Sequence, residues 1–270
     1  MSQYNIINIH GVPRSGTSWL GQILESVPNV KHKWQPLYSN TFKNRITADS
    51  SEKDIYDFYD AVYNMDDEYL DRSKQRELGL YPKWENKTEN PDVLVVKQTS
   101  NHFLLDKLLS SLDNFKAVAI IRNPCGSLNS FKNSPSEFEP TWNFEEEWKS
   151  APKKNQGRAE NYFGFEKWVE AVNLFEKNQK KFPDKLIIVK YEDLLNNPVF
   201  ETKRLFDFFG LEYTVQTQNF IEESTSKNID NIWSVFKGKR DGKEFEKDMD
   251  PNIIKEVYNL TRQYGLEKYL

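Results

Sequence analysis

A stretch near the start of the chain, HGVPRSGTSWLGQIL at residues 10–24, has the pattern of a phosphate-binding loop. A run of β-branched residues precedes it, a Gly-x-x-x-x-Gly spacing joins Gly11 to Gly16, and an amphipathic helical pattern follows. The glycines let successive backbone N–H groups turn inward, and the start of the helix adds its positive end. The residues predicted to hold phosphate are Arg14, Ser15, Gly16, Thr17 and Ser18.

The lysine that usually follows the second glycine of such a loop is missing. Thr17 stands there, and Arg14 supplies a cation from inside the loop instead. The alternative interpretation is a glycine turn between strand and helix that binds no ligand.

Basic residues end the other strands that the sequence predicts. Lys97, Arg122 and Lys190 stand where a magnesium-dependent nucleotide enzyme would place an acid for the metal. We therefore expect side chains to neutralise the bound anion, and we predict no metal site. The pattern disfavours ATP, but a P-loop kinase remains an alternative that a strict Mg²⁺ requirement would indicate.

Four short apolar runs, separated by helical patterns, must position these residues. The runs are residues 4–9, 92–97, 115–122 and 185–191. They predict an α/β fold of three layers, in which helices flank a central parallel sheet and the phosphate loop follows the first strand. The 270 residues suit one large domain, which we assign to residues 1–270.

Two segments, 39–91 and 132–163, fit this alternation poorly and are rich in aromatic residues. We expect them to be insertions that build the substrate side of the site, because such insertions at the carboxyl edge of a sheet often do so. The alternative is that they are surface helices whose aromatic residues pack on the body of the domain.

Composition excludes several classes of protein. A net charge of −4 argues against a nucleic-acid partner, and the single cysteine, Cys125, excludes an internal disulfide. There is no signal peptide and no apolar run long enough to span a bilayer, so we expect a cytoplasmic protein. Aromatic residues make up 14% of the chain and can stack on a base or a sugar.

At two motifs the sequence resembles the sulfotransferases that use 3′-phosphoadenosine 5′-phosphosulfate (PAPS). PRSGTSWL at residues 13–20 resembles their 5′-phosphosulfate loop, and IIRNPCGSLNSF at residues 120–131 resembles their 3′-phosphate motif. In the second motif, Arg122 and Ser130 keep the expected spacing of eight residues. The segments 189–198 and 205–211 resemble a later strand and helix of the family, so the resemblance covers most of the chain.

The resemblance implies further contacts with the nucleotide. Trp19 and Tyr191 would contact the adenine, with ordinary core packing as the alternative for each. The basic, glycine-containing stretch FKGKRDGK at residues 236–243 is similar in place to the loop that covers the 3′-phosphate, although its order differs. Its candidates are Lys237, Gly238, Lys239 and Arg240.

Sulfuryl transfer to an alcohol needs a base, cations around the sulfonate and support for the leaving phosphate. The resemblance implies that Arg14 and Lys97 act on the transferring group. For the base we predict His102, with His32 as the second candidate. Gln35 stands where carbohydrate-type members often carry a glutamate, and an amide cannot take a proton.

The expected activity is transfer of the sulfuryl group from PAPS to a hydroxyl, with a sugar in a glycan or glycolipid as the preferred acceptor. The resemblance is closer to bacterial and carbohydrate-type members than to cytosolic small-molecule ones. A small phenol or alcohol is the alternative acceptor, and a nucleotide-binding module without catalysis is a further alternative. The sequence does not identify the acceptor or the oligomeric state.

Overall fold

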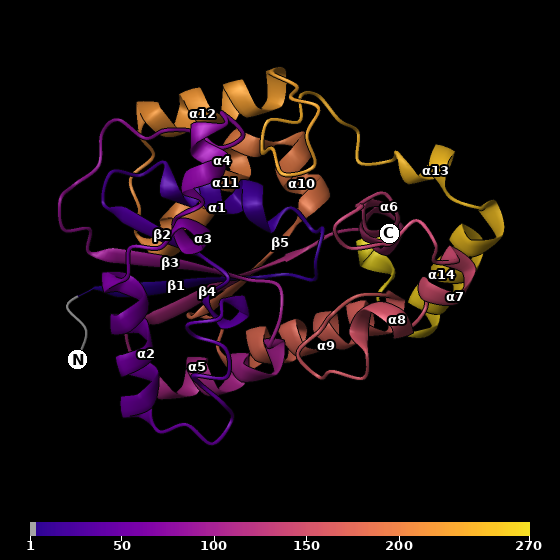
Figure 1. Cartoon of the computed structure of the whole chain (residues 1–270), viewed down its shortest axis with the longest axis horizontal. Coiled ribbons are helices and arrows are strands. Elements are labelled where there is room, and N and C mark those ends of the chain that lie inside the picture. The colour runs from indigo at the N-terminus through magenta and orange to yellow at the C-terminus, as the bar shows by residue number, and fades with distance from the viewer. Residues whose placement is uncertain (1–3) are drawn as a thin grey trace.

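The computed structural model describes residues 4–270, and a parallel sheet lies at its centre (Figure 1). Within these residues five strands pair in the order β2-β3-β1-β4-β5, and every pairing is parallel. The strands are β1 Asn5–His10, β2 Val30–Trp34, β3 Val93–Gln98, β4 Phe115–Ile121 and β5 Leu186–Lys190. The predicted fold class is therefore confirmed, and four of the strands coincide with the four apolar runs.

The central strands are mostly apolar on both faces because both faces of the sheet are covered. In β1, Ile6 packs into the core beneath one face, whereas Ile7 and Ile9 pack into the core beneath the other. Side chains of a strand alternate between faces, so a continuous apolar run fills both cores. The sequence predicted these strands for that reason.

Helices form a layer on each face of the sheet (Figure 1). One layer holds α1 Thr17–Glu25, α10 Tyr191–Asn196, α11 Pro198–Phe209 and α12 Val215–Ser226. The other holds α2 Glu52–Asn64, α5 Leu105–Ser111 and α9 Phe165–Lys181. The apolar stripe of each helix packs on the strands, and the loops at the carboxyl ends of the strands are left to build a site.

Shorter helices fill the connections. The α-helices are α3 Glu68–Asp71, α4 Ser73–Glu77, α6 Pro124–Lys132, α7 Phe144–Glu147, α8 Pro152–Asn155, α13 Phe245–Asp248 and α14 Pro251–Gln263. The 3₁₀ turns are η1 Pro36–Tyr38, η2 His102–Leu104 and η3 Glu267–Tyr269. In the 39–91 segment, Phe58 and Tyr59 of α2 are buried in the core, so these two aromatic residues serve packing. Among the described residues, no helix is both long and apolar enough to cross a membrane.

The edge strand β2 was not predicted, because its sequence VKHKW is largely polar. Its residues His32 and Lys33 are nevertheless buried. The Lys33 ammonium lies 2.6 Å from the Asp71 carboxylate and also donates to the carbonyl of Met65. A buried charge is tolerated when it is paired and hydrogen-bonded, and these partners come from α3 and the loop before it.

Candidate active site

The loop between β1 and α1 is closely packed on the neighbouring strands. Gly16 has φ = 88°, and a Cβ built there would lie 2.5 Å from the Tyr191 ring. At Gly11 a Cβ would lie 2.8 Å from the carbonyl oxygen of Ile120. Both positions therefore require glycine. Gly16 combines a left-handed conformation with a close contact, whereas Gly11 has the close contact alone. Arg14 also adopts a left-handed conformation, with φ = 72°.

A cavity of about 270 Å³ opens beside this loop. Its walls come from the loop, the start of α1, the ends of β3 and β4, and the segment before α13. The predicted residues that line it are Arg14, Gly16, Thr17, Ser18, Trp19, Lys97, Arg122, Ser130, Tyr191, Lys237 and Gly238. Among the other residues singled out in the sequence, Gln35 and Arg240 also line it, whereas Ser15, Lys239, His102 and His32 do not.

Arg122 and Ser130 lie next to Arg14. The Arg14 Nε donates to the Ser130 hydroxyl at 3.1 Å, and Arg122 donates to the Arg14 carbonyl at 3.1 Å. The Arg122 guanidinium stacks on the Tyr191 ring at 4.6 Å and lies 3.7 Å from the Glu244 carboxylate. Its Nε is buried and has no hydrogen-bond partner within residues 4–270. The two predicted phosphate motifs thus meet at one wall of the cavity.

Lys97 is a buried cation at the carboxyl end of β3. Its side chain passes over the Trp34 ring, with Nζ 4.4 Å from the ring centre. No carboxylate of residues 4–270 lies within ion-pair distance of it. Burial lowers the pKa of Lys97 well below its usual value, and the positive charges of Arg72 and Arg14 lower it further. An incoming anion would favour the charged form of this lysine.

His102 lies outside the cavity, enclosed in the core. Its Nδ1 is 3.0 Å from the Nδ1 of His10, and its ring packs against Tyr162 and Phe175. Burial, followed by the neighbouring His10, lowers the pKa of His102 well below its usual value. This placement gives no support to His102 as the base, and that assignment stays a prediction.

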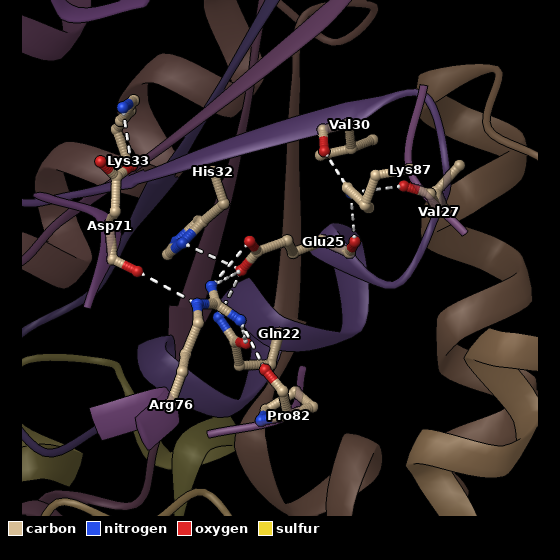
Figure 2. Close-up of polar contacts among 10 residues, drawn as sticks. All are labelled: Gln22, Glu25, Val27, Val30, His32, Lys33, Asp71, Arg76, Pro82 and Lys87. Atoms are coloured by element: carbon tan, nitrogen blue, oxygen red, sulfur yellow. Dashed lines mark hydrogen bonds and ion pairs between the residues drawn. The ribbon is translucent and has the colours of Figure 1, made fainter. Parts of the chain in front are cut away.

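His32, the second candidate, belongs to a buried ionic network beneath α1 (Figure 2). Its Nδ1 is 3.4 Å from the Glu25 carboxylate, and Arg76 donates to both oxygens of that carboxylate at 2.7 Å. Burial alone would raise the pKa of Glu25, but the neighbouring Arg76 charge holds it below its usual value. Both His32 ring nitrogens are buried without a hydrogen-bond partner within residues 4–270, so His32 is a side chain packed between β2 and α1.

Lys87 completes this network at the end of α1. Its ammonium donates to the carbonyls of Glu25 and Val27 at 2.8 and 2.9 Å, and also to that of Val30 (Figure 2). Carbonyls at the end of a helix lack partners within the helix, and a cation is favourable there. The network therefore holds the helix that begins at the phosphate loop.

Several lining residues were not singled out in the sequence. Glu137 and Lys154, both in the 132–163 segment, form an ion pair of 2.6 Å at the cavity wall. Neither belongs to a motif, so only their position in space could have identified them. The aromatic lining residues not assigned a role are Trp34, Tyr38, Tyr69, Tyr81, Phe163 and Trp233.

A family model described as "Sulfotransferase family" matches residues 7–215, which include the loop, Lys97, Arg122, Ser130 and Tyr191. The chain belongs to the sulfotransferase family. The match spans both phosphate motifs that suggested this family, so the prediction of a sulfotransferase is confirmed. No curated protein matches the sequence.

Solved structures of other proteins share the fold of this chain. A mouse sulfotransferase in complex with PAP, adenosine 3′,5′-bisphosphate, has a TM-score of 0.55 at 15% identity, covering 98% of this chain and 89% of that one. A sulfotransferase from Alicyclobacillus acidocaldarius has a TM-score of 0.52 at 14% identity, covering 98% and 93%. Retinol dehydratase in complex with androsterone and the inactive cofactor PAP has a TM-score of 0.53 at 15% identity, covering 96% and 80%.

Proposed function

We propose that this sulfotransferase uses PAPS as its donor and transfers the sulfuryl group to a hydroxyl. The observation that carries the proposal is the cluster of Arg14, Ser130 and Arg122 beside the loop, because it provides two anion sites on one cavity. A donor with a 5′-phosphosulfate and a 3′-phosphate has two such anionic groups. PAP is the nucleotide present in two of the compared structures, which supports the same donor.

In this proposal the loop holds the 5′ end of the donor. Backbone N–H groups around Gly16, the positive end of α1 and the hydroxyls of Thr17 and Ser18 face the phosphate. Arg14 and Lys97 bring positive charge to the sulfonate and to the bridging oxygen, where negative charge develops. Arginine keeps its proton under these conditions, so Arg14 acts electrostatically.

The remaining nucleotide contacts are assigned by position. Trp19 lines the cavity, and its indole N–H donates to the Ser224 hydroxyl at 2.9 Å, which fixes the plane of the ring. Tyr191 stacks on Arg122 and packs on Gly16, so its role in adenine binding is combined with support of the loop. Lys237, Gly238 and Arg240 line the side where the 3′-phosphate would bind, whereas Ser15 and Lys239 would act from outside the cavity wall.

We propose a sugar as the acceptor. Flat aromatic side chains form much of the acceptor side of the cavity, and such rings stack on the apolar face of a sugar. A volume of about 270 Å³ is at the lower end of ordinary ligand sites, so it encloses the reacting end of an acceptor and no long glycan. A phenol fits the same aromatic wall and remains the second candidate acceptor.

Metal-independent transfer is part of the proposal. The strand ends beside the cavity carry Lys97 and Arg122, and no cluster of three or more potential metal ligands occurs within residues 4–270. Activity should therefore persist in EDTA. An absolute requirement for Mg²⁺ would favour the kinase alternative.

Calorimetry and label transfer together test the proposed function. The protein should bind PAP far more tightly than AMP, and radiolabel from [³⁵S]PAPS should appear on a hydroxyl acceptor from a panel of sugars and phenols. Equal affinity for PAP and AMP would refute the donor assignment. PAP binding without transfer to any acceptor would instead favour the non-catalytic module.

A further inference from the structure

On the basis of the proposed function, we propose that Glu137 is the general base that takes the proton of the acceptor hydroxyl. Lys154 acts as its positioning residue. Both side chains line the cavity, and their ion pair measures 2.6 Å. Neither was assigned a role from the sequence.

Glu137 is the carboxylate that the described residues, 4–270, contribute to the cavity wall. The predicted bases His102 and His32 are buried elsewhere, and the lining residues Gln35 and Thr99 cannot take a proton at neutral pH. A base must lie within reach of the proton that it removes, so position decides among these groups.

The charge of Glu137 is felt on both sides of the site. On the transfer side, burial lowers the pKa of Arg14 and of Lys97, and the Glu137 carboxylate opposes this lowering at both. On the aromatic side, burial raises the pKa of Tyr38 to about 12, and Glu137 is the next largest cause. The Glu137 carboxylate, which lines the same cavity, is therefore close enough to influence both the cations and the aromatic wall.

Lys154 keeps the Glu137 carboxylate oriented. The side chains of Glu137 and Lys154 are 24% and 23% exposed, so the pair is only partly screened by water. The Lys154 ammonium holds one carboxylate oxygen of Glu137, Oε2, while the other oxygen is available to the substrate.

The proposed step moves one proton to Glu137 and the sulfuryl group to the acceptor. The acceptor hydroxyl gives its proton to a Glu137 oxygen while its own oxygen forms a bond to sulfur. The bond between sulfur and the bridging oxygen breaks, and its electron pair leaves with PAP on that oxygen. Arg14 and Lys97 face the charge that develops there, and protonated Glu137 returns its proton to water.

The test compares Glu137→Gln with Glu139→Gln, a matched control at an exposed position two residues further along. Turnover is measured with [³⁵S]PAPS and two probes, 4-nitrophenyl β-galactoside and 4-nitrophenol. Glu137→Gln should lower kcat on the galactoside by about 10²–10⁴-fold, the usual scale for loss of a base. The loss on 4-nitrophenol should be much smaller, because this acidic phenol ionises without help. Glu139→Gln should match the wild type on both probes.

Two further measurements separate catalysis from structure. PAP affinity of Glu137→Gln should stay within about threefold of wild type, since the proposal gives Glu137 no role in nucleotide binding. Lys154→Gln should lower kcat on the galactoside while PAP affinity stays unchanged, and Lys154→Arg should restore kcat, because a cation again holds one Glu137 oxygen.

Each other outcome overturns the inference. Unchanged turnover of Glu137→Gln on the galactoside, equal losses on both probes, or loss of PAP binding would each show that Glu137 is not the base. A wild-type enzyme that binds PAP but labels neither probe would also overturn it, while the donor assignment stands. Failure of the wild type to bind PAP would refute the proposed function itself.

Discussion

Lowering the pH from about 7.5 to about 5 should destabilise the protein through its histidines. All three histidines of the chain, His10, His32 and His102, are buried. Burial lowers the pKa of His10 from 6.5 to about 3 and that of His32 from 6.5 to about 4, and it holds the pKa of His102 well below 6.5. Unfolded histidines bind protons in this range while the folded ones stay neutral, so acid favours the unfolded chain.

The size of the effect follows from these pKa values. A pH of about 5 lies about 1.5 units below the pKa of an unfolded histidine, and each unit corresponds to about 1.4 kcal/mol of free energy. His10 and His32 should therefore each lower the free energy of unfolding by about 2 kcal/mol, with His102 acting in the same direction. Their sum of about 4 kcal/mol is a large part of the roughly 5–15 kcal/mol by which domains are stable. The stability is complete above about pH 6.5 and is lost as the pH falls toward the folded-state values.

Urea unfolding at a series of pH values between about 7.5 and 5 measures this loss. Asparagine does not titrate, so the free energy of unfolding of His32→Asn should change less with pH than that of the wild type. The difference between the two changes should be about 2 kcal/mol over this pH range. A wild-type free energy of unfolding that changes by less than about 1 kcal/mol would refute the reasoning. So would an imidazole resonance of a folded histidine that titrates near neutral pH.

Three substitutions test the rest of the site and its support. Arg122→Ala should weaken PAP binding by about 30- to 1,000-fold, or about 2–4 kcal/mol for a charge-assisted contact, and should barely change AMP binding; equal losses in calorimetry would make Arg122 structural. Glu244→Gln should strengthen PAP binding by about two- to fivefold, because the carboxylate 3.7 Å from Arg122 competes with the phosphate; weaker binding would contradict this. Glu25→Gln should lower the free energy of unfolding by about 3–5 kcal/mol, since it leaves the half-buried Arg76 without its carboxylate; a urea midpoint equal to that of the wild type would rule this out.

Local spacing predicted most of the residues by which the two phosphate motifs line the cavity. The turn at Gly16 and the spacing of Arg122 from Ser130 lie within single strand–loop–helix units, so neighbours in sequence are neighbours in space. The central strands were equally readable, because burial on both faces demands a continuous apolar run. The edge strand β2 could not be predicted in this way, because its buried Lys33 is stabilised by Asp71, which is 38 residues away in the sequence.

The sequence by itself determined four of the five strands, the glycine loop after the first strand and the family, since each is visible as a local pattern of residues. Tertiary structure alone decided that the histidines are buried and that the Glu137 carboxylate lines the cavity. His102 is enclosed beside His10, which is 92 residues away in the sequence, and His32 is buried beneath α1 with its Nδ1 3.4 Å from the Glu25 carboxylate. Glu137 lines the cavity together with Lys154 and Phe163 of the same 132–163 segment. Whether a titratable side chain faces a cavity or a core depends on distant packing, which local pattern does not encode.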